Sequence, residues 1–245
     1  MKQKRLLKIK DANNWGWYQR KDGLQLLGVT TGLEYGLPKK QLENYYKNTS
    51  KAKIEQNYKA GCDFGSKAHD YFERILLGDV TFAVDASHIP HIKVFRAWIA
   101  KHNLKPIGIE LHVESEKFGY AGTCDCLGHL TACEDRTCCK VDFGTKLMVI
   151  DWKTSKSFGV GYGYQLAAYR QALIETGDID EGTGMIGFQI RNDTAAAQSY
   201  IYEHYDYCFH KFLCALEQFK GINFYKLKEM QWPYLDKQAL IINLG

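Results

Sequence analysis

Hydrophobic and polar residues repeat with two different periods along the chain, and each period predicts one type of secondary structure. Stretches of alternating or continuous apolar residues, bounded by glycine or polar clusters, are typical of β-strands. The most apolar stretch, Leu147 to Ile150, lies between Gly144 and a serine- and glycine-rich cluster, which suits a strand buried on both faces. The predicted strands cover residues 107–113, 120–130, 146–154, 185–191 and 199–204.

Apolar residues spaced three and four positions apart predict helices between these strands. The longest predicted helix covers residues 51–77 and ends at Gly78. Shorter ones cover residues 38–47, with Pro38 in the first turn, and 92–102, 164–176 and 207–219. Near the N-terminus, residues 15–29 predict a β-hairpin that turns at Asp22-Gly23, because Asp-Gly accepts the positive φ angles of such turns.

Length and composition predict one folded domain. The chain has 245 residues, 45% of them hydrophobic, and shows no internal repeat, low-complexity tract or obvious linker. No apolar run approaches the roughly 18 residues that a membrane span needs, and the basic start at Met1 is not followed by a signal-peptide core. We therefore expect an intracellular protein that does not insert into membranes. The formal net charge of +4 permits a polyanionic partner without predicting one.

Cysteines are frequent, but their spacing does not fit a common metal motif. Five of the eight lie between Cys124 and Cys139, with His129 among them. No pair has the CxxC spacing of zinc ribbons, which disfavours the alternative of a zinc-stabilised interaction protein. A strand over residues 120–130 places Asp125 and His129 on one face. Cys124 and Cys126 are then expected on the opposite face, as core thiols.

Charged side chains lie at the end of the central strand. Because side chains alternate along a strand, Asp151 and Lys153 point the same way and Trp152 points the other way. A neighbouring acid and amine suit a site for a metal and an anionic ligand, although a surface ion pair is the ordinary alternative. Two further pairs lie one helical turn apart, His69 with Glu73 and Gln165 with Tyr169. Instead of a role in a site, His69 could form an ordinary hydrogen bond at the helix surface, and Tyr169 could simply pack in the core.

Four short motifs occur in an order that resembles a known nuclease family. They are Gly65-Ser66-Lys67-Ala68-His69 with Glu73; Gly122-Thr123-Cys124-Asp125; Ile150-Asp151-Trp152-Lys153-Thr154-Ser155; and Gln165-Leu166-Ala167-Ala168-Tyr169. Together they resemble the PD-(D/E)XK nuclease superfamily over about residues 24–220. The likeness is greatest to its RecB-like exonuclease branch, which includes mitochondrial genome maintenance exonucleases and CRISPR-associated adaptation nucleases. Cys124 stands where the superfamily motif has proline, and the cysteine-bearing connection before Asp151 has no counterpart in the pattern.

The resemblance implies an α/β fold, with a restriction-endonuclease-like mixed β-sheet core flanked by helices. Residues 1–60 would form an N-terminal hairpin and helical segment, residues 61–220 the PD-(D/E)XK core, and residues 221–245 a C-terminal tail. All three parts belong to one nuclease domain.

The resemblance also implies a role for each motif residue. Asp125 and Asp151 would be oxygen ligands of Mg²⁺ or Mn²⁺, with His69 as a nitrogen ligand and the backbone carbonyl of Trp152 as a further ligand. The ammonium of Lys153 would orient the attacking water and offset the negative charge that develops on the scissile phosphate. Glu110 would add an acid to the site, with Glu114 as the competing choice. Glu73 would support His69 from the next helical turn without binding the metal itself. Substrate contacts would come from Gln165, Tyr169, Thr154 and Ser155.

The expected function is that of a Mg²⁺- or Mn²⁺-dependent deoxyribonuclease. An exonuclease acting on single strands or free ends is favoured, in recombination, repair or phage DNA metabolism, with a recombination or single-strand-binding protein as a possible partner. The alternative is a catalytically silent nucleic-acid-binding module of a recombination complex. Retention of His69, Asp125, Asp151 and Lys153 together speaks against that alternative, because silent sites commonly lose an acid or the lysine.

Overall fold

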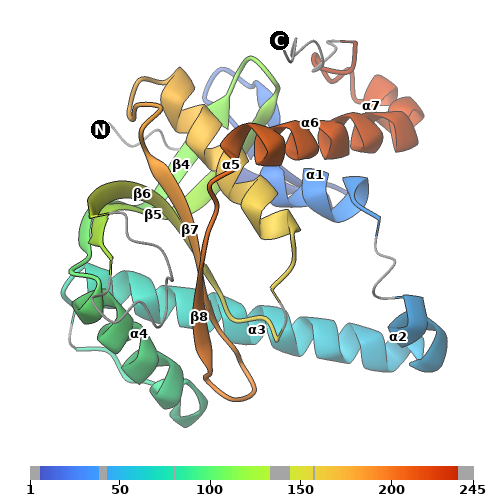
Figure 1. Ribbon diagram of the computed structural model, residues 1–245. Coiled ribbons are helices and arrows are strands. Elements are labelled where there is room, and N and C mark those ends of the chain that lie inside the picture. Colours follow the sequence, from blue (N-terminus) through green and yellow to red (C-terminus); the bar gives the residue numbers. More distant parts are fainter. Residues whose placement is uncertain (1–5, 39–42, 80, 133–143, 157, 237–245) are drawn as a thin grey trace.

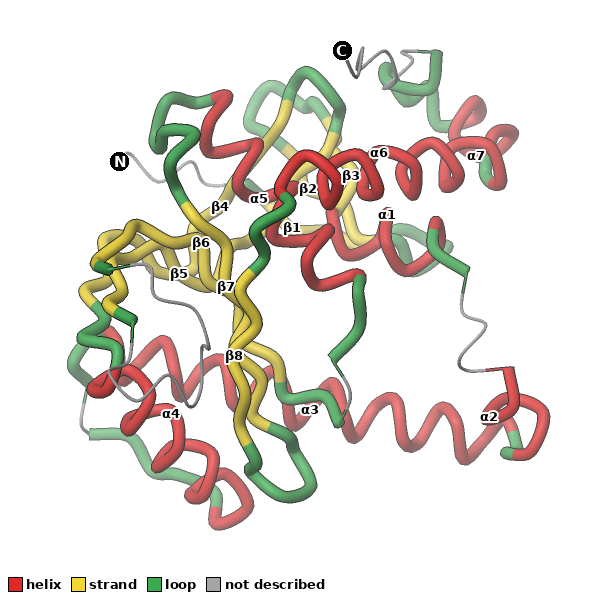
Figure 2. The backbone as a smooth tube through the Cα atoms, viewed as in Figure 1, coloured by secondary structure: helices red, strands yellow, loops and turns green. Residues whose placement is uncertain are grey.

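The computed structural model describes residues 6–38, 43–79, 81–132, 144–156 and 158–236, which form one mixed sheet between two layers of helices (Figure 1, Figure 2). The strands are β1 Leu7–Lys10, β2 Gly16–Gln19, β3 Gln25–Gly28, β4 Lys105–Ser115, β5 Tyr120–Thr131, β6 Thr145–Lys153, β7 Gly184–Ile190 and β8 Ala197–Ile201. The helices are α1 Val29–Gly36, α2 Glu43–Asn48, α3 Lys51–Leu76, α4 Ile89–Lys101, α5 Gly161–Glu175, α6 Tyr205–Ile222 and α7 Phe224–Glu229, with a 3₁₀ turn at Ala86–His88.

The sheet is built around β5, which pairs with three other strands. Its order is β1-β2-β3-β5-β6-β7-β8, and β4 pairs with β5 off this path. The pairs β3/β5 and β6/β7 are parallel and the others antiparallel. β3 pairs with the start of β5, at Tyr120 and Ala121, whereas β6 pairs with its end, from Cys126 onward. On this edge of β5, residues 122–125 pair with neither β3 nor β6, which leaves a gap in the strand pairing beside Asp125.

Two hydrophobic clusters cover the two faces of the sheet. One contains side chains of α1, α5 and α6, and the other contains side chains of α3 and α4. Successive residues of β6 contribute to both, because Val149 packs in the first cluster while Ile150 and Trp152 pack in the second. The central strand is therefore buried on both faces, as its continuous apolar run predicts. This arrangement is a three-layer α/β fold.

Most predicted elements are confirmed, with small shifts at their ends. The hairpin β2–β3 turns through Gly23 at φ +88°, and α3 ends before Gly78 at φ +77°. The helix predicted over residues 38–47 is confirmed in its second half, as α2, but Pro38 is not part of a helix; residues 39–42 lie outside the described residues. The short helix α1 was not expected. It contains two glycines and depends on packing against α6, where a Cβ on Gly36 would lie 2.0 Å from the carbonyl oxygen of Ala215.

The C-terminal tail packs against the body as far as it is described. Trp232 and Tyr234 are buried, and the indole of Trp232 donates a hydrogen bond of 3.1 Å to the carbonyl of Gln25. The apolar residues 240–242 lie outside the described residues. Among the helices of the described ranges, none has both the length and the apolar character of a membrane-spanning segment.

Candidate active site

The position of His69 is set by a close approach of α3 to the end of β6. A Cβ on Gly65 would lie 3.2 Å from the Oγ1 of Thr154, so the glycine lets the helix pass near the strand end. His69 follows one helical turn later, next to Ala68 and near Phe72, which are buried in the cluster of α3 and α4. Its Nδ1 lies 3.4 Å from Oδ1 of Asp125. The helix thus brings an imidazole to the opening in the sheet.

Asp125 lies where the pairing between β5 and β6 ends. The last register pair is Cys126 with Ile150, and Trp152 lies two residues further along β6. Oδ2 of Asp125 accepts a hydrogen bond of 2.7 Å from the backbone N–H of Trp152, while Oδ1 faces His69. The carboxylate therefore both closes the open ladder and presents an oxygen to the site.

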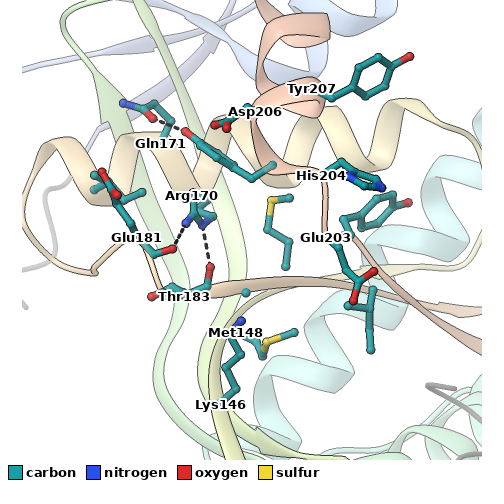
Figure 3. A pocket seen from close by; sticks show the side chains of 17 residues that line it. Lys146, Met148, Arg170, Gln171, Glu181, Thr183, Glu203, His204, Asp206 and Tyr207 are labelled. Carbon is teal, nitrogen blue, oxygen red and sulfur yellow. Dashed lines mark hydrogen bonds between the residues drawn. The ribbon is translucent and has the colours of Figure 1, made fainter. Parts of the chain in front are cut away.

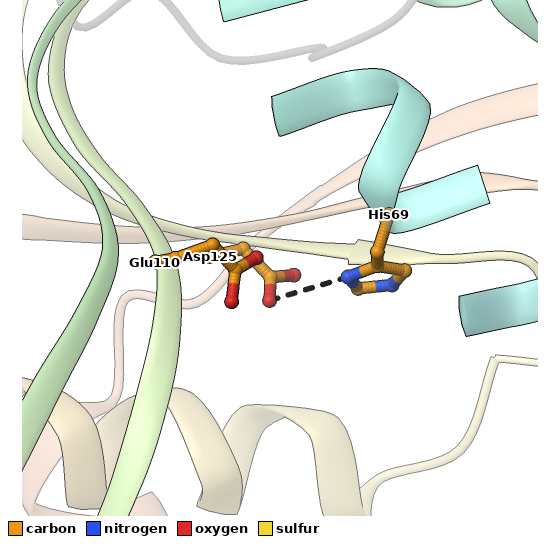
Figure 4. Close-up of side chains that lie close together, drawn as sticks. All are labelled: His69, Glu110 and Asp125. Atoms are coloured by element: carbon orange, nitrogen blue, oxygen red, sulfur yellow. Dashed lines mark ion pairs between the residues drawn. The ribbon is translucent and has the colours of Figure 1, made fainter. Parts of the chain in front are cut away.

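Glu110 lies opposite Asp125 on the adjacent strand β4 and completes a three-residue cluster (Figure 4). Its neighbours in β4, Ile109 and Leu111, pair with Cys126 and Cys124, which puts Glu110 opposite Asp125. The backbone of Glu110 has φ +48°, a left-handed conformation that interrupts the regular alternation of the strand. One ligand atom each from His69, Glu110 and Asp125 lies within 4.8 Å of the others, close enough to share a cation.

Asp151 and Lys153 form a buried ion pair beside this cluster. They point to the same side of β6, with Nζ of Lys153 2.5 Å from Oδ2 of Asp151. The Nε2 of Gln165 on α5 donates to Oδ1 of Asp151 at 3.0 Å and to the hydroxyl of Tyr169 at 2.9 Å. The predicted stripe of Gln165 and Tyr169 is therefore present, and it braces Asp151 from the α5 side.

The ionisation of these groups is strongly coupled, because they are buried together. Burial raises the pKa of Asp151 to about 6, although Lys153 opposes the shift. Burial, reinforced by the charge of Asp125, raises the pKa of Glu110 to about 7. Burial disfavours the charged form of His69, but the carboxylate of Asp125 outweighs it and the pKa of His69 is raised. For Asp125 the reverse holds, since His69 and then Lys153 outweigh burial and its pKa is lowered. Glu110 and Asp151 are thus harder to ionise than ordinary carboxylic acids, and a nearby cation would favour their ionised forms.

The remaining predicted residues lie around this centre in different ways. Glu73 is one turn after His69, and its charge contributes to the raised pKa of Glu110. Glu114, the competing choice, lies 4.0 Å from Arg20 of the hairpin and is not in the cluster around Asp125. The side chain of Thr154 is buried against α3, and the hydroxyl of Ser155 lies 3.0 Å from that of Tyr162. The carbonyl of Trp152 stays a predicted ligand.

The expected shared orientation of Cys124 and Cys126 is wrong. Cys124 packs in the cluster of α5, whereas Cys126 packs in the cluster of α3 and α4. The alternation breaks between them, at Asp125, opposite the left-handed backbone of Glu110. Both thiols are core residues, as expected, and burial raises the pKa of each. The cysteines of residues 133–139 lie outside the described residues.

Sequence reasoning missed Tyr162, which lies in the glycine-rich stretch before Gln165. Its ring centroid is 5.0 Å from Nζ of Lys153. Tyr162 lies in the first turn of α5, where a single aromatic residue carries no periodic signal, so neither hydrophobic pattern nor motif spacing pointed to it.

A pocket of about 950 Å³ lies elsewhere, between α5, β7 and the segment leading into α6 (Figure 3). Arg170 stacks on Tyr205 at 3.9 Å from its ring centroid and donates to the carbonyls of Thr183 and Glu181, which fixes the loop before β7. Acidic and basic side chains both line the pocket, so it has no clear preference for an anion or a cation. The catalytic candidates lie outside it.

Comparison of the chain with protein-family models and with curated proteins found no match. The function is therefore inferred from the chemistry of the site's own residues.

Proposed function

We propose that this protein is a metal-dependent phosphodiesterase. The observation that supports this most is the convergence of His69, Glu110 and Asp125, whose ligand atoms lie within 4.8 Å of one another beside the Asp151–Lys153 pair. More particularly, we propose a DNA exonuclease with a restriction-endonuclease-like core, as the resemblance to RecB-like nucleases implies.

The donor set fits Mg²⁺ or Mn²⁺. Carboxylate oxygens suit both ions, and the imidazole of His69 favours Mn²⁺. The raised pKa values of Glu110 and Asp151 are consistent with a cation-binding site, since a bound cation favours the ionised form of both acids. When bound, such an ion supplies Lewis acidity toward a phosphate oxygen and lowers the pKa of water. His69, Glu110 and Asp125 would hold it, with Asp151 close by.

The protein's own residues supply orientation and charge. Lys153 is held by Asp151 at 2.5 Å, which fixes an ammonium where negative charge develops as water adds to phosphorus and the P–O ester bond breaks. Asp125 orients the imidazole of His69, and Gln165 holds Asp151 from the opposite side. Each reactive group is thereby fixed by a second side chain on a regular strand or helix.

The direct test is digestion of end-labelled single- and double-stranded oligonucleotides with Mg²⁺ or Mn²⁺. Products are expected from the wild-type protein and from Lys117→Ala, which changes an exposed lysine on the β4–β5 turn. Lys153→Met is expected to be nearly inactive. Binding of DNA without any product, in either metal, would reject the proposal and favour a silent binding module.

A further inference from the structure

A row of aromatic rings extends from Lys153 toward the edge of the sheet. The ring of Tyr162 lies 5.0 Å from the Nζ of Lys153 and 4.7 Å from the ring of Phe158. Phe158 is in turn stacked on Tyr200, with ring centroids 4.0 Å apart and planes inclined by only 5°. All three residues are partly exposed. They lead from the candidate catalytic ammonium to β8.

The register of the sheet places this row in line with the reacting groups. Asp151 pairs with Gly187, and Gly187 pairs with Tyr200, so the three residues form one row across β6, β7 and β8. Phe158 covers the middle of that row, because a Cβ on Gly187 would lie 2.5 Å from its Cζ. Glycine at this position leaves the space that the ring occupies. The row is therefore a property of the sheet itself and not only of the loop before α5.

Positive charge accompanies the rings. Lys153 stands at one end, on β6. Lys156, whose side chain is 69% exposed, lies on the loop that also carries Phe158 and forms an ion pair with Asp193 at 4.0 Å. Aromatic rings next to a basic backbone track are the means by which proteins bind unpaired strands. The faces of paired bases are already stacked within the duplex, so a row of this kind favours unpaired bases.

We propose that Tyr162, Phe158 and Tyr200 form a base-stacking row that holds the single-stranded DNA segment next to the phosphate at Lys153. This inference rests on the proposed function, since it takes Lys153 as the site of the reaction. The bases stack against the exposed parts of the rings, while the phosphates run past Lys153 and Lys156.

The test uses a fluorescent single-stranded oligonucleotide and a matched one with abasic positions, titrated by anisotropy in metal-free buffer. Tyr162→Leu should weaken binding of the normal strand by roughly 5- to 150-fold, the range expected for the loss of one base–aromatic stack. Tyr162→Leu should change the affinity for the abasic strand little, because that strand has no base for the ring to stack on. Such a difference between the two strands shows that ring and base interact. Tyr162→Phe should restore most of the affinity. Tyr225→Leu, at a tyrosine that is 79% exposed on α7, is the control that should bind as wild type.

Equal weakening of the normal and abasic strands, or no weakening, would overturn the row as a base-binding site. Tyr200→Leu on β8 gives an independent loss with the same coupling, should Tyr162→Leu fold poorly. The two proposals fail separately. If the variants show the coupling but the wild-type protein cleaves nothing, only the nuclease proposal is refuted. If the wild-type protein cleaves DNA but the variants show no coupling, only the base-stacking row is refuted.

Discussion

Replacement of Lys153 by methionine tests both the catalytic role of the lysine and the cost of burying its partner. Asp151 is only 1% exposed, and Lys153 lies 2.5 Å from its Oδ2. Burial raises the pKa of Asp151 to about 6 even with the ammonium present, so the carboxylate depends on it. Removing one member of a buried ion pair costs about 3–5 kcal/mol. At roughly 2–4 °C per kcal/mol for a chain of this size, the Tm should fall by roughly 6–20 °C.

The same substitution should lower kcat by about two to three orders of magnitude, as expected for losing one preorganised charge at the transition state. Asp151→Asn in the Lys153→Met background removes the stranded charge and should recover most of the lost Tm without restoring cleavage. Thermal unfolding followed by circular dichroism and single-turnover digestion at 20 °C, where both variants are folded, measure the two effects. A wild-type Tm for Lys153→Met, or a double variant as unstable as the single one, refutes the buried-charge reasoning. A wild-type rate removes Lys153 from the mechanism.

Further substitutions at His69, at two glycines and at Gln165 test other parts of the structure. His69→Ala should weaken Mn²⁺ binding by about tenfold or more in calorimetric titration, whereas Asp70→Asn, at the exposed neighbour, should bind as wild type; equal affinities contradict the metal site. Gly36→Ala places a Cβ 2.0 Å from a backbone oxygen of α6 and should cost about 1–3 kcal/mol in urea unfolding. Gly61→Ala, where α3 has open space, should instead stabilise by roughly 0.5–1 kcal/mol, and the opposite order contradicts the packing. Gln165→Leu removes the donor to a buried carboxylate oxygen and should cost about 1–3 kcal/mol and lower kcat; unchanged stability would show that this bond is not formed.

The parts of the fold that sequence predicts are those governed by local periodicity. Strand alternation along β6 correctly separates Asp151 and Lys153 from Trp152, and the helical spacing along α5 correctly places Gln165 and Tyr169 on one stripe. These relations hold within a single element, so they need no knowledge of its partners. Pattern alone also identifies α3, whose apolar residues recur over its C-terminal half and end before a glycine.

The parts that sequence does not predict depend on contacts between distant segments. Helix α1 contains Gly32 and Gly36, which are poor helix formers, and it exists because α6 packs closely against it. Glu110 has a left-handed backbone opposite Asp125, and Cys124 and Cys126, on either side of Asp125, pack in different hydrophobic clusters. A rule of strict alternation along a strand cannot predict such a break. Its presence beside the acids agrees with the tendency of irregular strand residues to occur at functional sites.

Burying this many charged groups at one place opposes folding, and the surrounding packing explains how the arrangement is maintained. Trp152 separates Asp151 from Lys153 in sequence and is held on the other face of β6 by Phe95 and Trp98, with ring centroids 5.0 and 5.6 Å away. The hydrophobic free energy of this cluster stabilises the strand end that carries both charges. Asp151 contacts both Lys153 and Gln165, so its orientation is set by the folded protein. If the site acts on a phosphate as proposed, the free-energy cost of burying these charges is already met in the folded protein, before a substrate binds.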